Sequence, residues 1–406
     1  MTDYPVRRNA LLLAGGLVCL SGMFQLSVAL ATITLVAVTG IEGILGLGPA
    51  IFLCAGALAA LPAGRAMDRY GRMPVIRAAF ATGMAGSMVT ALGCRIGSAA
   101  LVILGFACAG ASAAVVLLSR AAAAEMFPPE RRARGMSLVL FGAVAGAVFG
   151  PLVFGPLFSG RELTADELAL PWLSGSLFML GGLILSFGVR PDPKVIGSSH
   201  PGEPIDDSPA APLRELVRRP GVGTALVAAV ASFAVMVGVM NLTGYVAVGH
   251  GHHQSDVFTI ISAHIVGMYG LVLVTGDLID RMGRRVALAL GLAVMALSTL
   301  SLVWLDGLTG MSLSLVGLGL GWNVSFVAAT TQLVSLARPS ERGRLVGLSD
   351  QLSSFVGAGL ALFGGLAYSS FGVVTLALSA TVLVVLPALW IVGRPGKGLA
   401  ASPGPA

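Results

Sequence analysis

Charge is scarce in this chain. Only 11% of its 406 residues are Asp, Glu, Lys or Arg, whereas a soluble domain carries roughly 25%. Hydrophobic residues make up 56%, and the mean hydropathy is +0.89. One folded core cannot hide so much apolar surface from water, so most of the chain must lie in lipid. This composition excludes a disordered protein, a secreted disulfide scaffold and a cytosolic enzyme. We expect no enzymatic activity and no bound cofactor.

Clusters of Gly, Pro and Arg divide the chain into apolar stretches of about 20 residues, the length that crosses a membrane. Their centres lie roughly near 21, 53, 84, 110, 147, 180, 234, 267, 295, 320, 356 and 382. The first stretch leads directly into the others, without the pattern of a cleavable signal peptide. The 55 glycines suit closely packed membrane helices. We therefore predict an all-α, multi-pass membrane protein with twelve transmembrane helices.

The basic residues are distributed unevenly along the predicted loops. Of the 25 Lys and Arg residues, only Arg95 and Arg161 fall on one side of the membrane. Because loops rich in Lys and Arg stay in the cytoplasm, both termini and the long middle loop are predicted to be cytoplasmic. The same rule accounts for the net charge of +6. That charge would suggest a nucleic-acid partner in a soluble protein, and we expect none here.

The chain contains an internal repeat. Residues 64–72 and 276–284 both follow the pattern Gly-x-x-x-Asp-Arg-x-Gly-Arg. A second echo pairs Glu130-Arg131 with Glu341-Arg342. Two copies at nearly one offset indicate a duplicated six-helix half. The predicted organisation is an N-terminal half at 1–189, a flexible cytoplasmic linker at 190–220, a C-terminal half at 221–394 and a cytoplasmic tail at 395–406.

Twelve helices in two halves, with this motif after the second and the eighth helix, resemble the major facilitator superfamily. The resemblance covers the chain apart from its termini and linker. It implies alternating access, with the acids and arginines of the motif linking the two halves at a cytoplasmic gate. Asp68, Arg72, Asp280 and Arg284 are therefore candidate gating residues. The alternative is that these arginines only fix the topology.

The predicted fifth helix contains Gly150-Pro151 and Gly155-Pro156. This stretch is similar to a Gly-Pro motif of drug/proton antiporters in the superfamily, a feature expected of an exporter. The alternative is a packed helix that kinks at its prolines.

Ionisable residues are absent near the middle of the first, fourth, seventh and eighth helices. This weakens proton-driven drug, peptide and sugar-acid transport, which use such groups. Soft donors are present instead. Met236 and Met240 share one face of the seventh helix, and His264 and Met268 share one face of the eighth. By depth, Met240 should lie level with His264, and Met236 with Met268. These four side chains are the predicted metal site.

The loop before the eighth helix adds His250, His252 and His253, which are candidates for metal capture at the outer surface. Neutral imidazole and thioether groups suit Cu(I), whereas zinc is more often held by thiolates or carboxylates. The alternatives are that methionine fills the core, that His264 is an interhelical donor, and that the loop histidines are merely solvated. Met84 and Met88 show the same spacing on the third helix without a neighbouring histidine.

The two motifs, Met236-x-x-x-Met240 and His264-x-x-x-Met268, resemble those of the CcoA-like copper importers, which are bacterial inner-membrane members of the superfamily. This resemblance implies copper uptake into the cytoplasm for the assembly of haem–copper oxidases. Copper chaperones and the lipid bilayer are the expected partners, and we expect a monomer. Cys19 and Cys54, near the middles of the first two helices, are candidate soft ligands from the other half or small packing residues.

The sequence therefore predicts an inner-membrane Cu(I) importer. An exporter of a drug or small metabolite in the same fold is the main alternative. A metal sensor without transport activity is a third, which the short linker and the lack of a soluble signalling domain disfavour.

Overall fold

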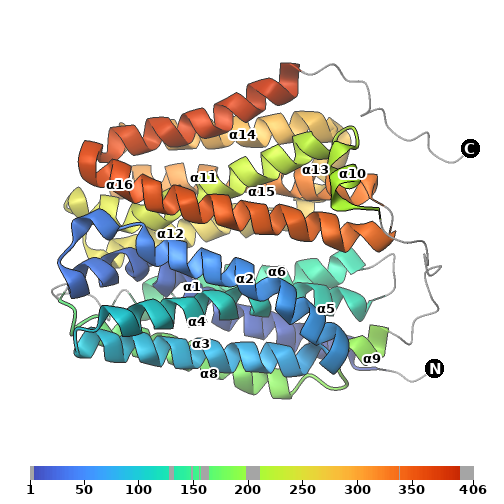
Figure 1. Ribbon diagram of the computed structural model, residues 1–406, viewed down its shortest axis with the longest axis horizontal. Helices are drawn as coiled ribbons and strands as arrows, with labels where there is room; N and C mark the ends of the chain where they lie inside the picture. The colour runs from blue at the N-terminus through green and yellow to red at the C-terminus, as the bar shows by residue number, and fades with distance from the viewer. Residues whose placement is uncertain are drawn as a thin grey trace, which may run out of the picture.

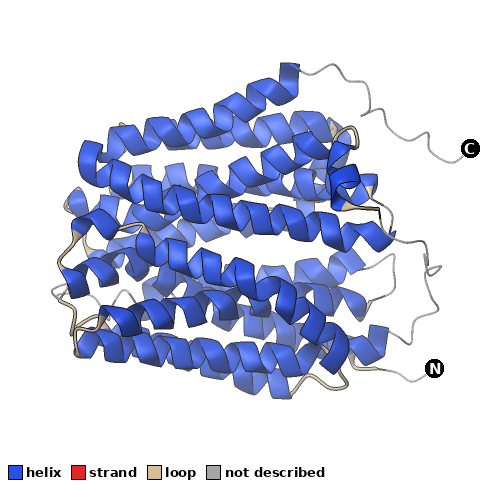
Figure 2. Cartoon of the chain, viewed as in Figure 1, coloured by secondary structure: helices blue, strands red, loops and turns tan. Residues whose placement is uncertain are grey.

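The computed structural model describes residues 4–127, 132–147, 150–154, 156, 164–197, 211–337 and 339–393. Within these ranges the chain is helical and no strand occurs (Figure 2). Hydrocarbon offers no hydrogen bonds to a backbone, and a helix pairs its N–H and C=O groups internally. The all-α prediction is confirmed for these residues. Residues 198–210 of the predicted linker and the predicted tail lie outside them, as do Glu130, Arg131, Arg161 and Gly155.

The N-terminal elements form the lower part of the view in Figure 1. They are α1 (Val6–Thr39), η1 (Glu42–Ile44), α2 (Leu47–Tyr70), α3 (Arg72–Arg95), α4 (Ala99–Leu117), α5 (Ser119–Glu125), α6 (Arg132–Ala147), the π-helical turn η3 (Gly150–Phe154), α8 (Ala169–Phe187) and α9 (Pro193–Gly197). Gly150 and Pro151 of the Gly-Pro stretch begin η3. Such π-helical turns occur mostly as irregularities next to longer helices.

The C-terminal elements form the upper part of the same view (Figure 1). They are α10 (Leu213–Arg218), α11 (Val222–Gly249), α12 (Gln254–Tyr269), α13 (Val272–Met282), α14 (Arg284–Ser301), α15 (Leu308–Leu336) and α16 (Pro339–Gly393). Helix α16 bends at Gly372, where φ is 78°, and its second part runs back beside α14 (Figure 1).

Nine helical segments among the described residues are long and apolar enough to cross a membrane. A shorter apolar segment, 138–154, and the pair α12–α13 accompany them. The ninth segment, 345–393, has 49 residues. At 1.5 Å per residue this is more than twice a hydrocarbon core of about 30 Å, so the bend at Gly372 divides it into two passes. The structure is thus that of a multi-pass membrane protein.

The duplicated motif adopts the same local geometry in both copies. Gly71 turns the chain from α2 into α3 with φ of 95°, and Gly283 turns it from α13 into α14 with φ of 84°. Glycine populates this left-handed region without the steric cost that a Cβ brings. The repeated Gly-Arg pair therefore specifies a tight turn between two antiparallel helices.

The two groups of helices meet most closely at the end of the bundle opposite the basic turns, which we call the outer end. The backbone of Gly46, before α2, lies against α16, because a Cβ on Gly365 would come within 2.5 Å of the Gly46 nitrogen. Thr32 of α1 donates a hydrogen bond to the Asn241 carbonyl of α11 at 3.0 Å. The rings of Phe154 and Phe258 lie 5.3 Å apart. The outer end is therefore closed.

At the opposite, basic end, Arg120 of α5 and Asp350 of α16 form an ion pair between the halves at 3.8 Å. Both side chains are partly exposed, and such pairs contribute about 0–1 kcal/mol. Within the C-terminal half, Glu341 is fully buried and accepts hydrogen bonds from Arg219 at 2.6 and 3.0 Å. The strong pair thus holds α10 and α16 together within one half, and the pair between the halves is weak.

We predict that Gly365→Ala separates the halves at the outer end. The added Cβ meets backbone atoms of Gly46, which cannot rotate away, so the closed arrangement loses stability relative to an outward-open one. Spin labels are placed on Ile96 and Trp304 in a variant without native cysteines. Double electron–electron resonance between them measures this separation. The long-distance population should rise.

Gly359→Ala on the same helix is the matched control, because a Cβ there meets nothing within 4 Å. Its distance distribution should equal that of the parent. An unchanged distribution in Gly365→Ala would show that the Gly46 contact does not hold the outer end closed.

Candidate transport site

Met236 and Met240 lie one turn apart on α11. Both are buried, with 2% and 0% of their surface exposed. Gly244 follows Met240 by one further turn. A Cβ on Gly244 would lie 3.2 Å from the Val257 side chain of α12 and 3.2 Å from the Ala29 carbonyl of α1. Gly244 therefore lies at the junction of α1, α11 and α12.

His264 and Met268 lie one turn apart on α12. Val257, which meets Gly244, precedes His264 by two turns. His264 is 0% exposed and Met268 is 5% exposed. The Gly244–Val257 contact thus brings α11 and α12 together, and the ring of His264 is directed to the Leu315 carbonyl of α15. That the four donors converge on one ion stays a prediction.

The relative depth of the donors follows from the same contact. The helices are antiparallel, so continuing from the Gly244–Val257 pair at equal rise places His264 level with Val237. His264 then lies nearly level with Met236, with Met240 about one turn toward the outer end. This differs by about one turn from the register predicted from sequence, in which Met240 is level with His264, because the contact of Gly244 with Val257 sets the pairing of the two helices.

The imidazole of His264 is fixed by one hydrogen bond. Its Nδ1 lies 2.7 Å from the Leu315 carbonyl of α15. Because a carbonyl only accepts, Nδ1 must carry the hydrogen, and Nε2 must present its lone pair. Nε2 is buried and has no hydrogen-bond partner among the described residues. A buried acceptor left unmatched costs about 1–3 kcal/mol, which a bound ligand would offset.

Helix α15 holds the segment between His264 and Met268 in place. A Cβ on Gly319 would lie 2.6 Å from the His264 carbonyl oxygen and 2.8 Å from the Met268 nitrogen, so only glycine allows this approach. Asn323 donates to the Met268 carbonyl at 2.6 Å and accepts from Thr275 at 2.6 Å. These supports were not predicted from the sequence. The glycines and the asparagine of the tenth predicted helix were the available signal.

A polar contact joins α12 to the N-terminal half beside the donor stripe. The hydroxyl of Ser262 lies 2.8 Å from Gln25 Oε1 and 2.6 Å from the Ala147 carbonyl. Gln25 is fully buried and donates to the Gly146 carbonyl at 2.9 Å. Ser262 and His264 are two residues apart, and so they point to opposite sides of α12. One side of α12 thus contacts the N-terminal half, and the opposite side carries His264.

Each of the three loop histidines already has a polar partner within the protein. His250 Nδ1 lies 2.8 Å from the Val246 carbonyl, and His252 Nε2 lies 2.6 Å from the Asp306 carbonyl. His253 caps α12 together with Asp256. Among the described residues, no three His, Cys, Asp or Glu side chains form a metal-binding group. Capture by these histidines therefore stays a prediction.

The two candidate cysteines lie in the N-terminal half, in α1 and α2 respectively, and both are free thiols. Cys19 Sγ lies 3.3 Å from the position of a Cβ on Gly181, so it packs against α8. Cys54 lies half-buried in α2, which packs against α4 and α16. These positions do not bring Cys19 toward α11 and α12.

The arginines of the repeated motif bond within their own halves. Arg72 binds Glu125 with two hydrogen bonds, at 2.9 and 2.7 Å. Arg284 donates to the Ser335 hydroxyl at 2.6 Å. The side chains of Asp68 and Asp280 lie outside the described part of the chain. The gating role of all four residues stays a prediction.

An aromatic group lies between α11, α12 and α15. Trp322 stacks on Phe326 at 5.1 Å with an interplanar angle of 20°, and Tyr269 meets Trp322 edge-on at 6.0 Å. Phe233 of α11 lies 6.1 Å from Phe326. The indole nitrogen of Trp322 is buried and lacks a hydrogen-bond partner among the described residues. This group offers flat apolar faces with one unmatched donor.

Comparisons with known proteins agree on the fold. The chain is 28% identical over 366 residues to the uncharacterized MFS-type transporter YddS of Bacillus subtilis, covering 87% of this chain and 84% of that protein. It is 29% identical over 323 residues to the riboflavin transporter RfnT of Brucella anthropi, covering 78% and 75%. The partially occluded, inward-open structure of the xylose transporter XylE from E. coli superimposes with a TM-score of 0.71 at 13% identity, covering 97% and 99%.

The sequence profile described as Major Facilitator Superfamily matches residues 11–362. This range contains both donor pairs and both copies of the repeated motif. The chain is a multi-pass carrier that belongs to the major facilitator superfamily.

Proposed function

We propose that this transporter carries copper, as Cu(I), into the bacterial cytoplasm through the Met/His site of α11 and α12. The observation that carries the proposal is the unmatched Nε2 of His264. Its partner nitrogen is held by Leu315, so its lone pair has a fixed direction. In metal sites the non-ligating nitrogen of a histidine is commonly held in this way by a carbonyl. Copper delivered by this route would supply haem–copper oxidase assembly.

The chemistry of the donors suits a soft monovalent ion. Thioethers and imidazole bind Cu(I) without charge, so the empty site does not bury an anion in the membrane. At most 2% of the surface of each of three donors is exposed: Met236, Met240 and His264. A hard, strongly hydrated cation would find no oxygen ligands in this donor set.

The contacts between the halves suit alternating access. The outer end is closed by backbone contacts at Gly46, and the basic end is held by the weak Arg120–Asp350 pair. In the proposed topology of twelve passes with cytoplasmic termini, the basic end opens to the cytoplasm. The site then releases its ion inward when this pair parts, and the bacterial inner membrane is the proposed location.

We predict that His264→Ala lowers cellular uptake of radioactive copper by about tenfold or more, since ligand-sphere changes commonly cost that much in metal affinity. Met236→Ala/Met240→Ala should have the same effect. The measurement is initial uptake under reducing conditions, normalised to the amount of protein in the membrane.

The matched control is Met84→Ala/Met88→Ala, which removes a methionine pair of identical spacing from α3. Its uptake should equal that of the parent. Normal copper uptake in both the His264 and the Met236/Met240 variants would exclude the site.

We predict that replacing His250, His252 and His253 together with Ala raises the half-saturating copper concentration several-fold and leaves the maximal rate unchanged. These residues lie in the outer loop, where they raise local copper without entering the pathway. Copper saturation curves of the parent and the triple variant provide the measurement. An unchanged half-saturating copper concentration would show that the histidines serve only the structure of the loop. A strongly reduced maximal rate would place them inside the pathway.

A second candidate is transport of a planar organic solute. It is favoured by the similarity to the riboflavin transporter RfnT and by the aromatic group around Trp322. Aromatic faces stack on flat rings, and the Trp322 N–H would donate to a ring acceptor. In this case the Met/His stripes would only pack the core.

Uptake of labelled riboflavin, measured beside copper, separates the two candidates. We predict that the parent takes up copper and that Trp322→Phe, which keeps a ring but removes the indole N–H, leaves this uptake unchanged. Riboflavin uptake that Trp322→Phe abolishes and His264→Ala leaves intact would instead establish the second candidate.

A further inference from the structure

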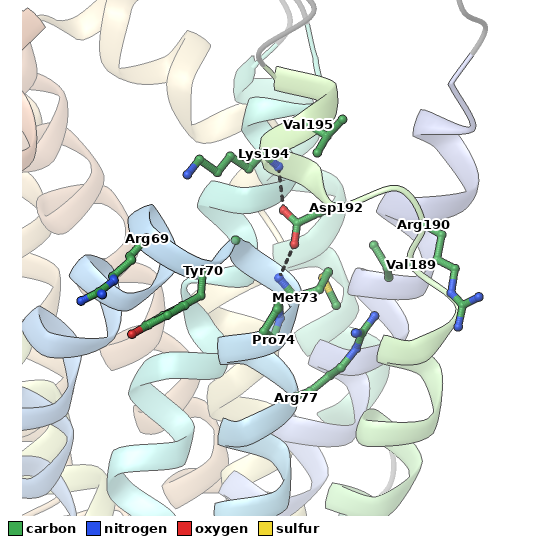
Figure 3. Close-up of a pocket in the computed structure, with 11 residues that line it drawn as sticks. Arg69, Tyr70, Met73, Pro74, Arg77, Val189, Arg190, Asp192, Lys194 and Val195 are labelled. Atoms are coloured by element: carbon green, nitrogen blue, oxygen red, sulfur yellow. Dashed lines mark hydrogen bonds between the residues drawn. The ribbon is translucent and has the colours of Figure 1, made fainter.

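A basic pocket lies at the basic end of the N-terminal half, far along the chain from the donor stripes. Its volume is about 730 Å³, and it is formed by the α2–α3 turn, the end of α8 and α9. Four basic side chains and one acid line it: Arg69, Arg77, Arg190, Lys194 and Asp192 (Figure 3). Arg69 belongs to the repeated motif, but neither the motif nor the copper proposal accounts for Arg77, Arg190 and Lys194.

The single acid of the pocket is already engaged. Asp192 accepts hydrogen bonds from the backbone N–H groups of Met73 at 2.8 Å and Lys194 at 2.9 Å (Figure 3). It also accepts one from the backbone N–H of Arg72 at 3.1 Å. Two of these donors are the first residues of α3, where the helix dipole favours a negative charge. The carboxylate of Asp192 is therefore matched by backbone groups and not by the arginine side chains.

Hydrogen bonds to backbone carbonyls hold the wall of the pocket in place. Asn9 and Arg8 of α1 donate to the Arg190 carbonyl at 3.1 Å each, which fixes the segment between α8 and α9. Arg77 donates to the Ser186 carbonyl at 3.2 Å, and its guanidinium lies 4.8 Å from the Phe187 ring. The Arg77 Nε–H lacks an acceptor among the described residues. No described carboxylate pairs with Arg77 or Arg190.

An exposed apolar stripe leads from the bilayer to this pocket. On α8, Leu177, Leu180, Ile184 and Phe187 recur on one face with 66%, 37%, 62% and 51% of their surface exposed. The stripe ends at Phe187, directly below the Arg77 guanidinium. A free phosphate would use the basic groups alone, whereas an acyl chain would also cover this stripe.

We propose that the pocket binds the phosphate headgroup of an anionic phospholipid, whose acyl chain lies along the exposed stripe of α8. Basic pockets between membrane helices on the cytoplasmic side are known to suit such headgroups. Arg77 and Arg190 contact the phosphate, and the ring of Phe187 separates this polar contact from the hydrocarbon. The bound lipid joins α3, α8 and α9 at the turn that carries the repeated motif.

Native mass spectrometry of the full-length protein in detergent tests this proposal with added phosphatidylglycerol or phosphatidylcholine. The parent should retain phosphatidylglycerol in several-fold excess over phosphatidylcholine. Arg77→Gln and Arg190→Gln should each reduce this excess, and the double variant should abolish it. Arg190 is exposed, so its variant tests the proposal even if Arg77→Gln, which loses the Ser186 bond, fails to fold.

Arg214→Gln is the matched control, because it removes an exposed arginine from α10 in the other half. It should retain phosphatidylglycerol like the parent. Equal retention by the double variant and the parent would overturn the lipid site.

The source of the phosphate is tested with glycerol phosphate, which is the headgroup without acyl chains, and with Ile184→Ser on the stripe. We expect glycerol phosphate not to displace the lipid, and Ile184→Ser to weaken lipid retention. Displacement by glycerol phosphate at concentrations comparable to the lipid, with no effect of Ile184→Ser, would overturn the lipid and assign the pocket to a free phosphate ester.

Discussion

A hydrocarbon surrounding makes no hydrogen bonds, and the polar groups of the C-terminal half are arranged around this constraint. Asn323 of α15 binds the Met268 carbonyl and the Thr275 hydroxyl, and the Leu315 carbonyl holds the ring of His264. Each of these bonds joins α15 to the segments on either side of the break between α12 and α13. The position of the imidazole therefore depends on α15 as much as on its own helix. The Nε2 atom is left unmatched, whereas the Nδ1 atom of the same ring is held by the Leu315 carbonyl.

Charge is excluded from this interior and lies at the two ends of the bundle, as the Arg95–Asp166 pair at the outer end and the Arg120–Asp350 pair at the basic end show. Where the halves meet inside the bundle, neutral groups make the contacts, as Ser262 does with Gln25 and Thr32 does with the Asn241 carbonyl. Neutral hydrogen bonds contribute about 0.5–1.5 kcal/mol each and can be exchanged during movement. Breaking a buried ion pair costs about 3–5 kcal/mol, which suits parts that stay together. The buried Glu341–Arg219 pair lies accordingly within one half.

The sequence predicted the helical class, the repeated turns and the membrane nature of the chain, because these follow from local composition and spacing. The family was predicted from the same motif. The supports of the candidate site were not predicted, because Leu315 acts through its carbonyl and Gly319 through the absence of a side chain. Neither leaves a distinctive residue pattern. The partner of Arg72 was also missed, since Glu125 lies 53 residues away and only the packing of α3 against α5 brings them together. The register between α11 and α12 was wrong by about one turn, because it is set by the contact of Gly244 with Val257, which the spacing of the donors does not reveal.

The contact of Gly46 with α16 has a consequence for how the two ends respond to their surroundings. It is made of backbone, with no group that titrates or attracts counter-ions. Dissolved salt and pH act on charged groups, so they have little effect on the stability of this backbone contact. The Arg120–Asp350 pair at the other end is partly exposed and is screened as ionic strength rises. The end closed at Gly46 thus responds little to salt and acidity, whereas the end held by Arg120 and Asp350 responds to ionic strength.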